Sequence, residues 1–272
     1  MPVTRPKIPE SIKREIRQRC GFGCVVCGLP LYEYDHMLGW ANVQRHDADE
    51  ITLLCDRHHR EKTSGLLPAN VVYRANQNPR NTMVGESHPY NLHYVGTSCR
   101  LILGSVGFTR STFVEGTELT AIAIDGTPII AFTFEQGHLF LSLQVFDHNS
   151  RRVLWVERNE LKYRPSAWDI TLVGRNLTIR DGAKQILLDV VFNPPGIVEV
   201  RRGRFHLNGL LVLVHPDHIH YVNRRNTIAN LSFADFDVAL MVGDPIDSRR
   251  VALALPAGNR RVFHKDGANK PK

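Results

Sequence analysis

The stretch that decides the fold of the first part of this chain is Ile51-Thr52-Leu53-Leu54-Cys55-Asp56-Arg57-His58-His59-Arg60-Glu61-Lys62. A short apolar run leads directly into Cys55 and then into residues that favour a helix. We expect this helix to run through Lys62 and to end before Gly65 and Pro68, because both residue types disfavour its continuation. Within the stretch, Cys55 and His58 have the spacing of two metal ligands on one tight turn.

A second pair with the same spacing lies upstream, in Cys24-Val25-Val26-Cys27. Two short pairs separated by about thirty residues can close a tetrahedral Cys₃His site around zinc. A region this small buries little apolar surface, so bound Zn²⁺ would supply part of its stability. The alternatives are that the thiols are unrelated buried residues, or that His59 replaces His58 as the fourth ligand.

The remaining cysteines, Cys20 and Cys99, are expected to be buried thiols. An odd total of five cysteines, without an apolar N-terminal signal segment, argues against a disulfide framework and favours a reducing, cytoplasmic location. No run of about eighteen apolar residues occurs, so we expect no membrane association.

The residues around the two pairs have clear local preferences. Residues 10–19 place Ile12 and Ile16 four positions apart among charged residues, which predicts a short helix. Residues 32–36 alternate aromatic and acidic side chains before His36 and are expected to be extended, whereas residues 39–50 are polar and typical of a loop.

The order of these motifs resembles the HNH endonuclease family. The resemblance covers residues 10–68 and rests on the first Cys pair, then Asp35-His36, then the run that ends in Cys55-Asp56-Arg57-His58-His59-Arg60-Glu61-Lys62. It implies a ββα-metal core with structural zinc held by Cys24, Cys27, Cys55 and His58, and an enzyme that hydrolyses phosphodiester bonds in nucleic acid, with double-stranded DNA as the expected partner.

The same resemblance implies a role for each catalytic residue. His36 matches the general base that activates water, and the near-neutral pKa of a histidine suits that task. Asp35 and His59 match ligands of one catalytic divalent ion, Mg²⁺ or another metal, which stabilises the phosphate and the leaving oxygen. Lys62 is expected either to contact a substrate phosphate or to brace the helix, and Thr63 would be a weak ligand.

One position departs from the family pattern. Glu50 stands where the family usually has Asn or His, a residue that ties the loop together and orients the base. Glu accepts hydrogen bonds but cannot donate them as an amide does. His46 is a nearby substitute if the loop alignment shifts. Loss of activity, with the zinc module kept to bind nucleic acid, is therefore the alternative function.

The rest of the chain differs in character. Residues 71–100 are rich in Asn, Pro, Gly and Ser and are expected to form a linker. From residue 101 onward, short apolar runs alternate with turn signals, among them Asp125-Gly126 between two runs, a strong hairpin signal. Residues 207–214 are expected to form one strand. We therefore predict an α+β protein with an HNH module over 1–70, a linker over 71–100 and a mostly antiparallel β-rich domain, sandwich or barrel-like, over 101–272.

The charge lies mainly outside the expected nuclease. Residues 1–68 hold ten basic and nine acidic residues, a net of +1, whereas the whole chain has +7, which leaves +6 beyond residue 68. A basic surface suits a polyanionic partner. The β-rich domain is therefore expected to recognise a target, a ligand or a partner, with restriction or antiviral defence as the analogous roles and a homo-oligomer as a further possibility.

Weaker candidates lie in the β-rich part. His218 and His220 would share one strand face and suggest a second metal site, although polar-face residues are the commoner explanation. The arginines at 201, 202, 204, 224 and 225 either bind phosphate or form a solvated basic edge. Trp155, Trp168 and Tyr163 can stack on bases, but core packing is the more frequent role of such residues.

Overall fold

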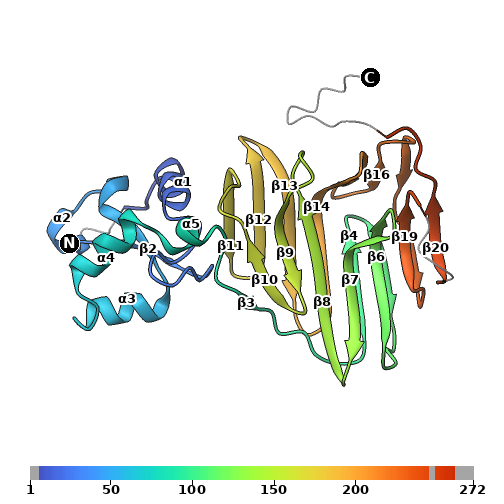
Figure 1. Cartoon of the computed structure of the whole chain (residues 1–272), viewed down its shortest axis with the longest axis horizontal. Coiled ribbons are helices and arrows are strands. Elements are labelled where there is room, and N and C mark those ends of the chain that lie inside the picture. The colour runs from blue at the N-terminus through green and yellow to red at the C-terminus, as the bar shows by residue number, and fades with distance from the viewer. Residues whose placement is uncertain (1–5, 245–248, 261–272) are drawn as a thin grey trace. The chain divides into compact units, whose positions relative to one another are not determined.

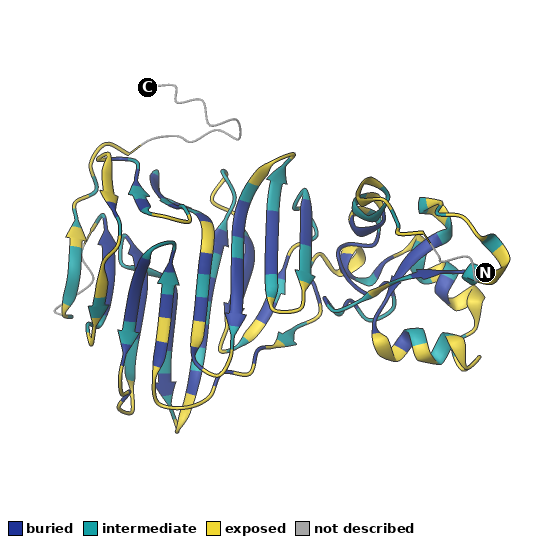
Figure 2. Ribbon diagram, turned by 180° about the vertical axis from the view of Figure 1, so that it is seen from behind, coloured by how far each residue is buried: buried dark blue, intermediate teal, exposed yellow. Residues whose placement is uncertain are grey.

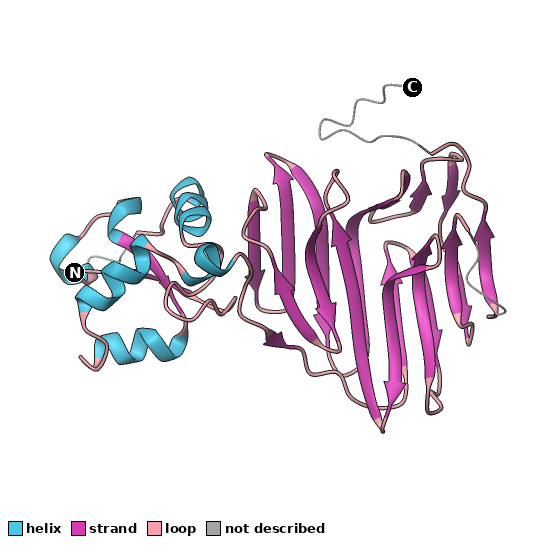
Figure 3. Ribbon diagram, viewed as in Figure 1, coloured by secondary structure: helices cyan, strands magenta, loops and turns pink. Residues whose placement is uncertain are grey.

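The computed structural model describes residues 6–244 and 249–260, and its chain forms two compact units (Figure 1). Unit 1 consists of residues 1–90 together with residues 163–172, and unit 2 consists of residues 91–162 and 173–272. The protein is α+β: the helices lie in the N-terminal part, and the larger C-terminal part is built from strands (Figure 3).

Unit 1 is built around a two-stranded antiparallel sheet and a helix. The strands β1 (Glu33–His36) and β2 (Ile51–Leu54) pair with Glu33 opposite Leu54 and His36 opposite Ile51. Helix α3 (Asp56–Thr63) follows β2 directly, with Cys55 at its N-cap. Strand β2 is fully buried because its apolar residues form the centre of the unit's core.

Four further α-helices and one 3₁₀ turn lie in the described part of unit 1. Helix α1 (Glu10–Arg19) has the range expected from the sequence and buries Ile16 in the core. The short helix α2 (Trp40–Val43) and the 3₁₀ turn η1 (Ala48–Glu50) lie in the stretch expected to be a loop. Helices α4 (Ala69–Gln77) and α5 (Arg80–Val84) follow α3.

The segment 71–100, expected to be a linker, therefore contains regular structure. Besides α4 and α5 it includes strand β3 (Tyr90–Asn91) and the first residues of β4 (Cys99–Leu103). Pro68 and Pro79 are the N-caps of α4 and α5. A proline fits this position because its fixed φ is compatible with entry into a helix and its missing N–H is not needed there.

The β-rich part of the chain contains two open sheets rather than a closed barrel. The first has eight strands in the order β20-β19-β6-β7-β8-β9-β10-β3. Besides β3, its strands are β6 (Thr117–Ile124), β7 (Thr127–Glu135), β8 (His138–Phe146), β9 (Arg152–Glu157), β10 (Glu160–Tyr163), β19 (Val238–Val242) and β20 (Val251–Leu255). Strands β6 to β9 form an antiparallel meander, whereas β19 pairs in parallel with both β6 and β20.

The second sheet has ten strands, and its main path runs β11-β12-β13-β14-β15-β16-β17. These strands are β11 (Asp169–Val173), β12 (Asn176–Gly182), β13 (Gln185–Asn193), β14 (Ile197–Leu207), β15 (Leu210–Val214), β16 (Ile219–Tyr221) and β17 (Asn226–Ile228). Strand β4 adds in parallel to β14, β5 (Val106–Arg110) pairs with β4, and β18 (Ser232–Ala234) pairs with β5.

Buried and more exposed residues alternate along the strands, and the buried residues form the core of unit 2. In β8 every second residue is buried, from Leu139 to Val145, and buried and partly exposed positions alternate visibly along the strands (Figure 2). The hairpin at Asp125-Gly126 is present: φ is 46° at Asp125 and 75° at Gly126, and Ile124 pairs with Thr127. Both positive φ angles are those that a type I′ turn requires.

Candidate metal centre and active site

Cys24, Cys27, Cys55 and His58 form a compact cluster positioned to bind a metal ion such as zinc. Their ligand atoms all lie within 4.8 Å of one another. The Cys27 and Cys55 sulfurs are 3.7 Å apart, and His58 Nδ1 lies 3.3 Å from Cys24 Sγ and 3.2 Å from Cys55 Sγ. Ligand atoms bound tetrahedrally to zinc at about 2.0–2.3 Å lie about 3.3–3.8 Å apart, so the four residues fit the ion.

The turn that carries the first pair is held on several sides. Gly28 N donates to Cys24 O at 2.7 Å, which closes the turn, and Val25 N donates to Leu53 O of β2 at 3.0 Å. The buried Asn81 of α5 donates from Nδ2 to Gly28 O at 3.1 Å and to Gly21 O at 3.0 Å. Gly28 has φ of 79°, and a Cβ there would meet Asn81 Oδ1 at 2.1 Å, so glycine is required.

The electrostatics of the cluster suit a cation. The hydrogen bond from Cys27 holds the pKa of the Cys24 thiol well below its usual range. Burial raises the pKa of Cys55, because the charged form loses hydration there. At least one thiolate ligand is thus favoured at neutral pH, and a bound cation would stabilise the other thiolates.

Helix α3 presents a second group of side chains next to the cluster. His58 faces the cysteines, and His59, about 100° further around the helix, lies beside β1 instead. His59 Nε2 is 3.4 Å from Asp35 Oδ1, and its Nδ1 is 3.4 Å from the exposed Glu33. The assignment of His58 rather than His59 to the Cys cluster follows from these distances.

Asp35 and His59 also meet the distance condition for a shared divalent ion. Two ligand atoms that each lie about 2.0–2.2 Å from one ion are about 3.0–3.6 Å apart at ordinary bond angles. The 3.4 Å between Asp35 Oδ1 and His59 Nε2 falls in this range. Such a site would have two protein ligands and would leave its other positions to water and phosphate, as Mg²⁺ sites commonly do.

Lys62 connects β1 to α3. Its Nζ donates to Asp35 Oδ2 at 2.5 Å and to His36 O at 2.7 Å, and its side chain is only 12% exposed. A lysine held this way braces the helix against the strand. It also places a positive charge on the carboxylate that would bind the divalent ion.

The imidazole of His36 is buried and held through Nε2. This atom lies 3.1 Å from Arg45 O and 3.3 Å from His46 Nδ1, and the ring packs edge-on against Trp40. Arg45 in turn forms a two-point ion pair with Glu50, the residue that departs from the family pattern. The sequence indicates His46 only as a substitute for the residue at position 50, and no local signal identifies Trp40 as a site residue.

One open pocket brings these residues together. Its volume is about 380 Å³, and its lining includes Asp35, His36, His59, Lys62 and Thr63. The Thr63 hydroxyl donates to His59 O at 2.9 Å, so it serves the helix backbone. The remaining lining residues are Tyr34, Met37, Leu38, Gly39 and Trp40.

The two histidine candidates of unit 2, His218 and His220, contact neighbouring side chains. The ring of His218 stacks on His215 at 4.4 Å and lies beside Asp217, whereas His220 faces Thr227. Within residues 6–244 and 249–260, the Cys₃His cluster is the one group of three or more His, Cys, Asp or Glu close enough to share an ion. The second metal site suggested by His218 and His220 is therefore not formed.

The aromatic candidates likewise contact other side chains or the backbone. Tyr163 is fully buried and donates from its hydroxyl to Phe22 O at 2.6 Å, and the Arg14 guanidinium covers the Trp168 ring at 4.4 Å. The Arg152 guanidinium lies 4.5 Å from the Trp155 ring. Arg201 and Arg202 are exposed on β14, and Arg201 pairs with Glu199 at 3.0 Å.

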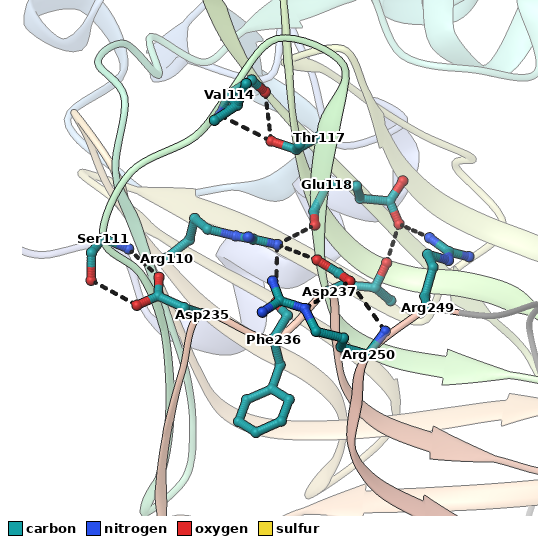
Figure 4. Close-up of polar contacts among 11 residues, drawn as sticks. Arg110, Ser111, Val114, Thr117, Glu118, Asp235, Phe236, Asp237, Arg249 and Arg250 are labelled. Atoms are coloured by element: carbon teal, nitrogen blue, oxygen red, sulfur yellow. Dashed lines mark hydrogen bonds and ion pairs between the residues drawn. The ribbon is translucent and has the colours of Figure 1, made fainter.

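A polar network in unit 2 was not visible in the sequence (Figure 4). Arg110, at the end of β5, donates to Glu118 O at 2.9 Å, to Phe236 O at 3.1 Å and to Asp237 Oδ1 at 2.9 Å. Arg250 N donates to Asp237 Oδ2, and Arg249 to Glu118 Oε1. The network pairs Arg110 and Arg250 with Asp237, and Arg249 with Glu118, and it holds β19 beside β6, which is a structural role.

No family model matches the chain, and no curated protein or solved structure matches it either. Among the helices of residues 6–244 and 249–260, none has the length and apolar character needed to cross a bilayer.

Proposed function

We propose that unit 1 is a zinc-braced HNH endonuclease module that hydrolyses phosphodiester bonds in double-stranded DNA. The proposal rests on helix α3, which follows β1 and β2 and contributes one side chain to each of two neighbouring sites. It presents His58 to the Cys₃His cluster and His59 to Asp35, in a pocket that His36 also lines.

Each side chain has a task in this reaction. Asp35 and His59 hold a divalent ion such as Mg²⁺, which supplies charge stabilisation to the phosphate and to the leaving oxygen when it is bound. His36 accepts the proton of the attacking water. Lys62 fixes the positions of Asp35 and the His36 backbone relative to α3 through its two hydrogen bonds.

For unit 2 we propose recognition. Its sheets make up most of the chain, and most of the net positive charge lies beyond residue 68. Strands β8 and β14, from different sheets, contact each other, which supports a sandwich arrangement. Unit 2 binds a DNA target, a regulatory ligand or a partner subunit, which includes a second copy of the chain. By analogy, the protein acts in restriction or antiviral defence.

Plasmid cleavage tests the enzymatic proposal. Purified protein is incubated with supercoiled plasmid and Mg²⁺, Mn²⁺ or Ni²⁺, and the nicked and linear forms are quantified. We expect metal-dependent nicking that His36→Ala lowers at least a hundredfold, since a positioned general base contributes about 10²–10⁴-fold. The matched control is His88→Ala, because His88 is an exposed histidine of unit 1 outside the pocket.

The outcome can contradict the proposal in two ways. Absence of nicking with every metal, or nicking that is equal in His36→Ala and wild type, rules out the catalytic role. The control excludes loss of activity through general damage to unit 1.

A non-catalytic zinc-stabilised nucleic-acid-binding protein is the second candidate. Two observations favour it: the Lys62 ammonium already neutralises Asp35, and Glu50 is engaged by Arg45. Both candidates predict DNA binding, and they differ in cleavage. Gel-shift binding that persists with no nicking under any metal would identify this second function.

A further inference from the structure

His46 contacts both the imidazole of His36 and the backbone of the N-terminal segment. Its Nδ1 lies 3.3 Å from His36 Nε2, and its Nε2 lies 2.8 Å from Pro6 O. Its ring also packs against Trp40, with the ring centroids 4.9 Å apart. We propose that His46 is a positioning residue that selects the tautomer of His36 and fixes its ring, an inference that rests on the proposed nuclease function.

The direction of the hydrogen bonds follows from the chemistry of the partners. A carbonyl oxygen only accepts, so His46 Nε2 donates its proton to Pro6 O. A neutral imidazole has one donor and one acceptor nitrogen, so His46 Nδ1 is an acceptor. The proton between the two rings is therefore supplied by His36 Nε2.

The second partner of His36 Nε2 also indicates that this nitrogen carries the proton. Arg45 O, at 3.1 Å, is also an acceptor. With two acceptors at Nε2, this nitrogen carries the proton, and the lone pair of His36 is on Nδ1. The Pro6 carbonyl thus sets the tautomer of His46, and His46 helps to set the tautomer of His36.

The loop that holds these groups is itself tied down. The guanidinium of Arg45 donates twice to the carboxylate of Glu50, the residue that precedes β2, which restrains the backbone between His46 and the strand. Trp40 closes the other side of the two imidazole rings. A base whose proton acceptor is always the same nitrogen loses no rate to the wrong tautomer.

Ring-nitrogen NMR on the full-length, zinc-bound protein tests the tautomer directly. The protein is labelled with ¹⁵N-histidine and measured at pH 8, above the ordinary histidine pKa of about 6.5. The His36 signals are assigned by their loss in His36→Gln. We expect the wild-type His36 to show a protonated Nε2 and an unprotonated Nδ1.

Two variants separate positioning from packing. His46→Phe keeps a ring against Trp40 but removes the acceptor, so we expect the His36 signals to move toward a tautomer mixture. The single-turnover cleavage rate should fall about tenfold with little change in DNA affinity. His46→Gln restores an acceptor and a donor in one side chain and should recover the rate to within about threefold of wild type.

His88→Phe is the control and should leave both readouts unchanged, because His88 is exposed and outside the pocket. A protonated Nδ1 on wild-type His36 overturns the proposal whether or not any variant folds. So do unchanged ring signals in His46→Phe, or a His46→Gln variant as slow as His46→Phe. If no protein cleaves DNA while the ring signals behave as expected, the nuclease function fails and the positioning role of His46 stands.

Discussion

Arg17 and Asp169 lie 152 positions apart in the sequence and form a buried, two-point ion pair in unit 1. Arg17 Nε donates to Asp169 Oδ1 and Arg17 Nη2 to Asp169 Oδ2, both at 2.8 Å. Arg17 also donates to the Tyr34 hydroxyl at 2.7 Å, which links the pair to β1. Unit 1 is therefore completed by residues 163–172, which include Asp169 at the start of β11.

The first prediction concerns this ion pair. Arg17→Ala should lower the free energy of unfolding of unit 1 by about 3–5 kcal/mol, because it removes both 2.8 Å hydrogen bonds of Arg17 from the buried Asp169 carboxylate, whereas Arg14 Nε is 4.0 Å away. The double variant Arg17→Met with Asp169→Leu should cost less than either single change. Urea unfolding followed by circular dichroism measures both. Arg60→Ala is the control, since Arg60 and Asp56 are each 75% exposed and their pair contributes little.

The second prediction concerns the Cys₃His cluster. Wild-type protein should contain one zinc ion per chain, and Cys24→Ser with Cys27→Ser should remove it and unfold unit 1, because two of four ligands are lost. Elemental analysis after dialysis measures the zinc. Cys20→Ala is the matched control: Cys20 is buried in the same unit but lies outside the cluster. Full zinc content in the double serine variant would contradict this assignment.

The third prediction concerns the charge that Lys62 places on Asp35. Lys62→Met keeps the aliphatic length but removes the cation, so Asp35 should bind Mn²⁺ about tenfold more tightly. The same change should weaken the contact between β1 and α3, with a loss of about 1–3 kcal/mol of stability. Calorimetric titration and urea unfolding give the two values. Lys7→Met, at an exposed position of unit 1 outside the pocket, should change neither. Equal Mn²⁺ affinity in Lys62→Met and wild type would show that the lysine does not compete with the ion.

The fourth prediction concerns pH and the β6–β7 hairpin. The hydrogen bonds from Arg260, at 2.6 and 2.9 Å, lower the pKa of Asp125 from 3.8 to about 2. A lowered folded-state pKa stabilises the protein above the unfolded pKa, and this stabilisation is lost as the pH falls towards 2. It amounts to at most about 2 kcal/mol, of which roughly half is lost by pH 3.

Asp125→Asn tests this pH dependence, because Asn also tolerates the positive φ of the turn but does not titrate. Urea unfolding at pH 6 and pH 3 should show a loss of stability that is smaller in the variant by about 1 kcal/mol. Equal losses in the two proteins would assign the acid sensitivity to other carboxylates.

The local part of the fold could be predicted because the signals are short-range. The helix over 10–19, the helix after Cys55 and the Asp125-Gly126 hairpin all follow from patterns within a few residues. The Cys₃His ligands were also identified, since ligand spacing is itself a local property. Catalysis by Asp35, His36 and His59 stays a prediction.

Pro68 follows the end of α3 as expected, but Pro68 and Pro79 are also the N-caps of α4 and α5, two helices in a region where only a linker is expected over 71–100. A second turn signal, at Asn208-Gly209, was missed. Residues 207–214 were expected to form one strand, but Asn208 and Gly209, with φ of 49° and 76°, form a turn between β14 and β15. Asn-Gly is a hairpin signal of the same kind as Asp125-Gly126, and it was masked by the apolar residues on either side.

The non-local contacts could not be predicted from one sequence. Nothing near Arg17 indicates Asp169, and nothing near Phe22 indicates that its carbonyl receives the Tyr163 hydroxyl. The role of His46 depended on the path of the loop over residues 37–50, which contains α2 and η1 where only loop was expected.

The wide sequence separation of Arg17 and Asp169 also has a consequence during translation. A ribosome that adds about 5–20 residues per second exposes Arg17 on the order of ten seconds before Asp169 has been synthesised. All four zinc ligands are in the nascent chain by residue 58, so the metal cluster can close first. Unit 1 would then remain incomplete, with Arg17 bonded to Tyr34 but lacking Asp169, until β10 and the start of β11 have been made.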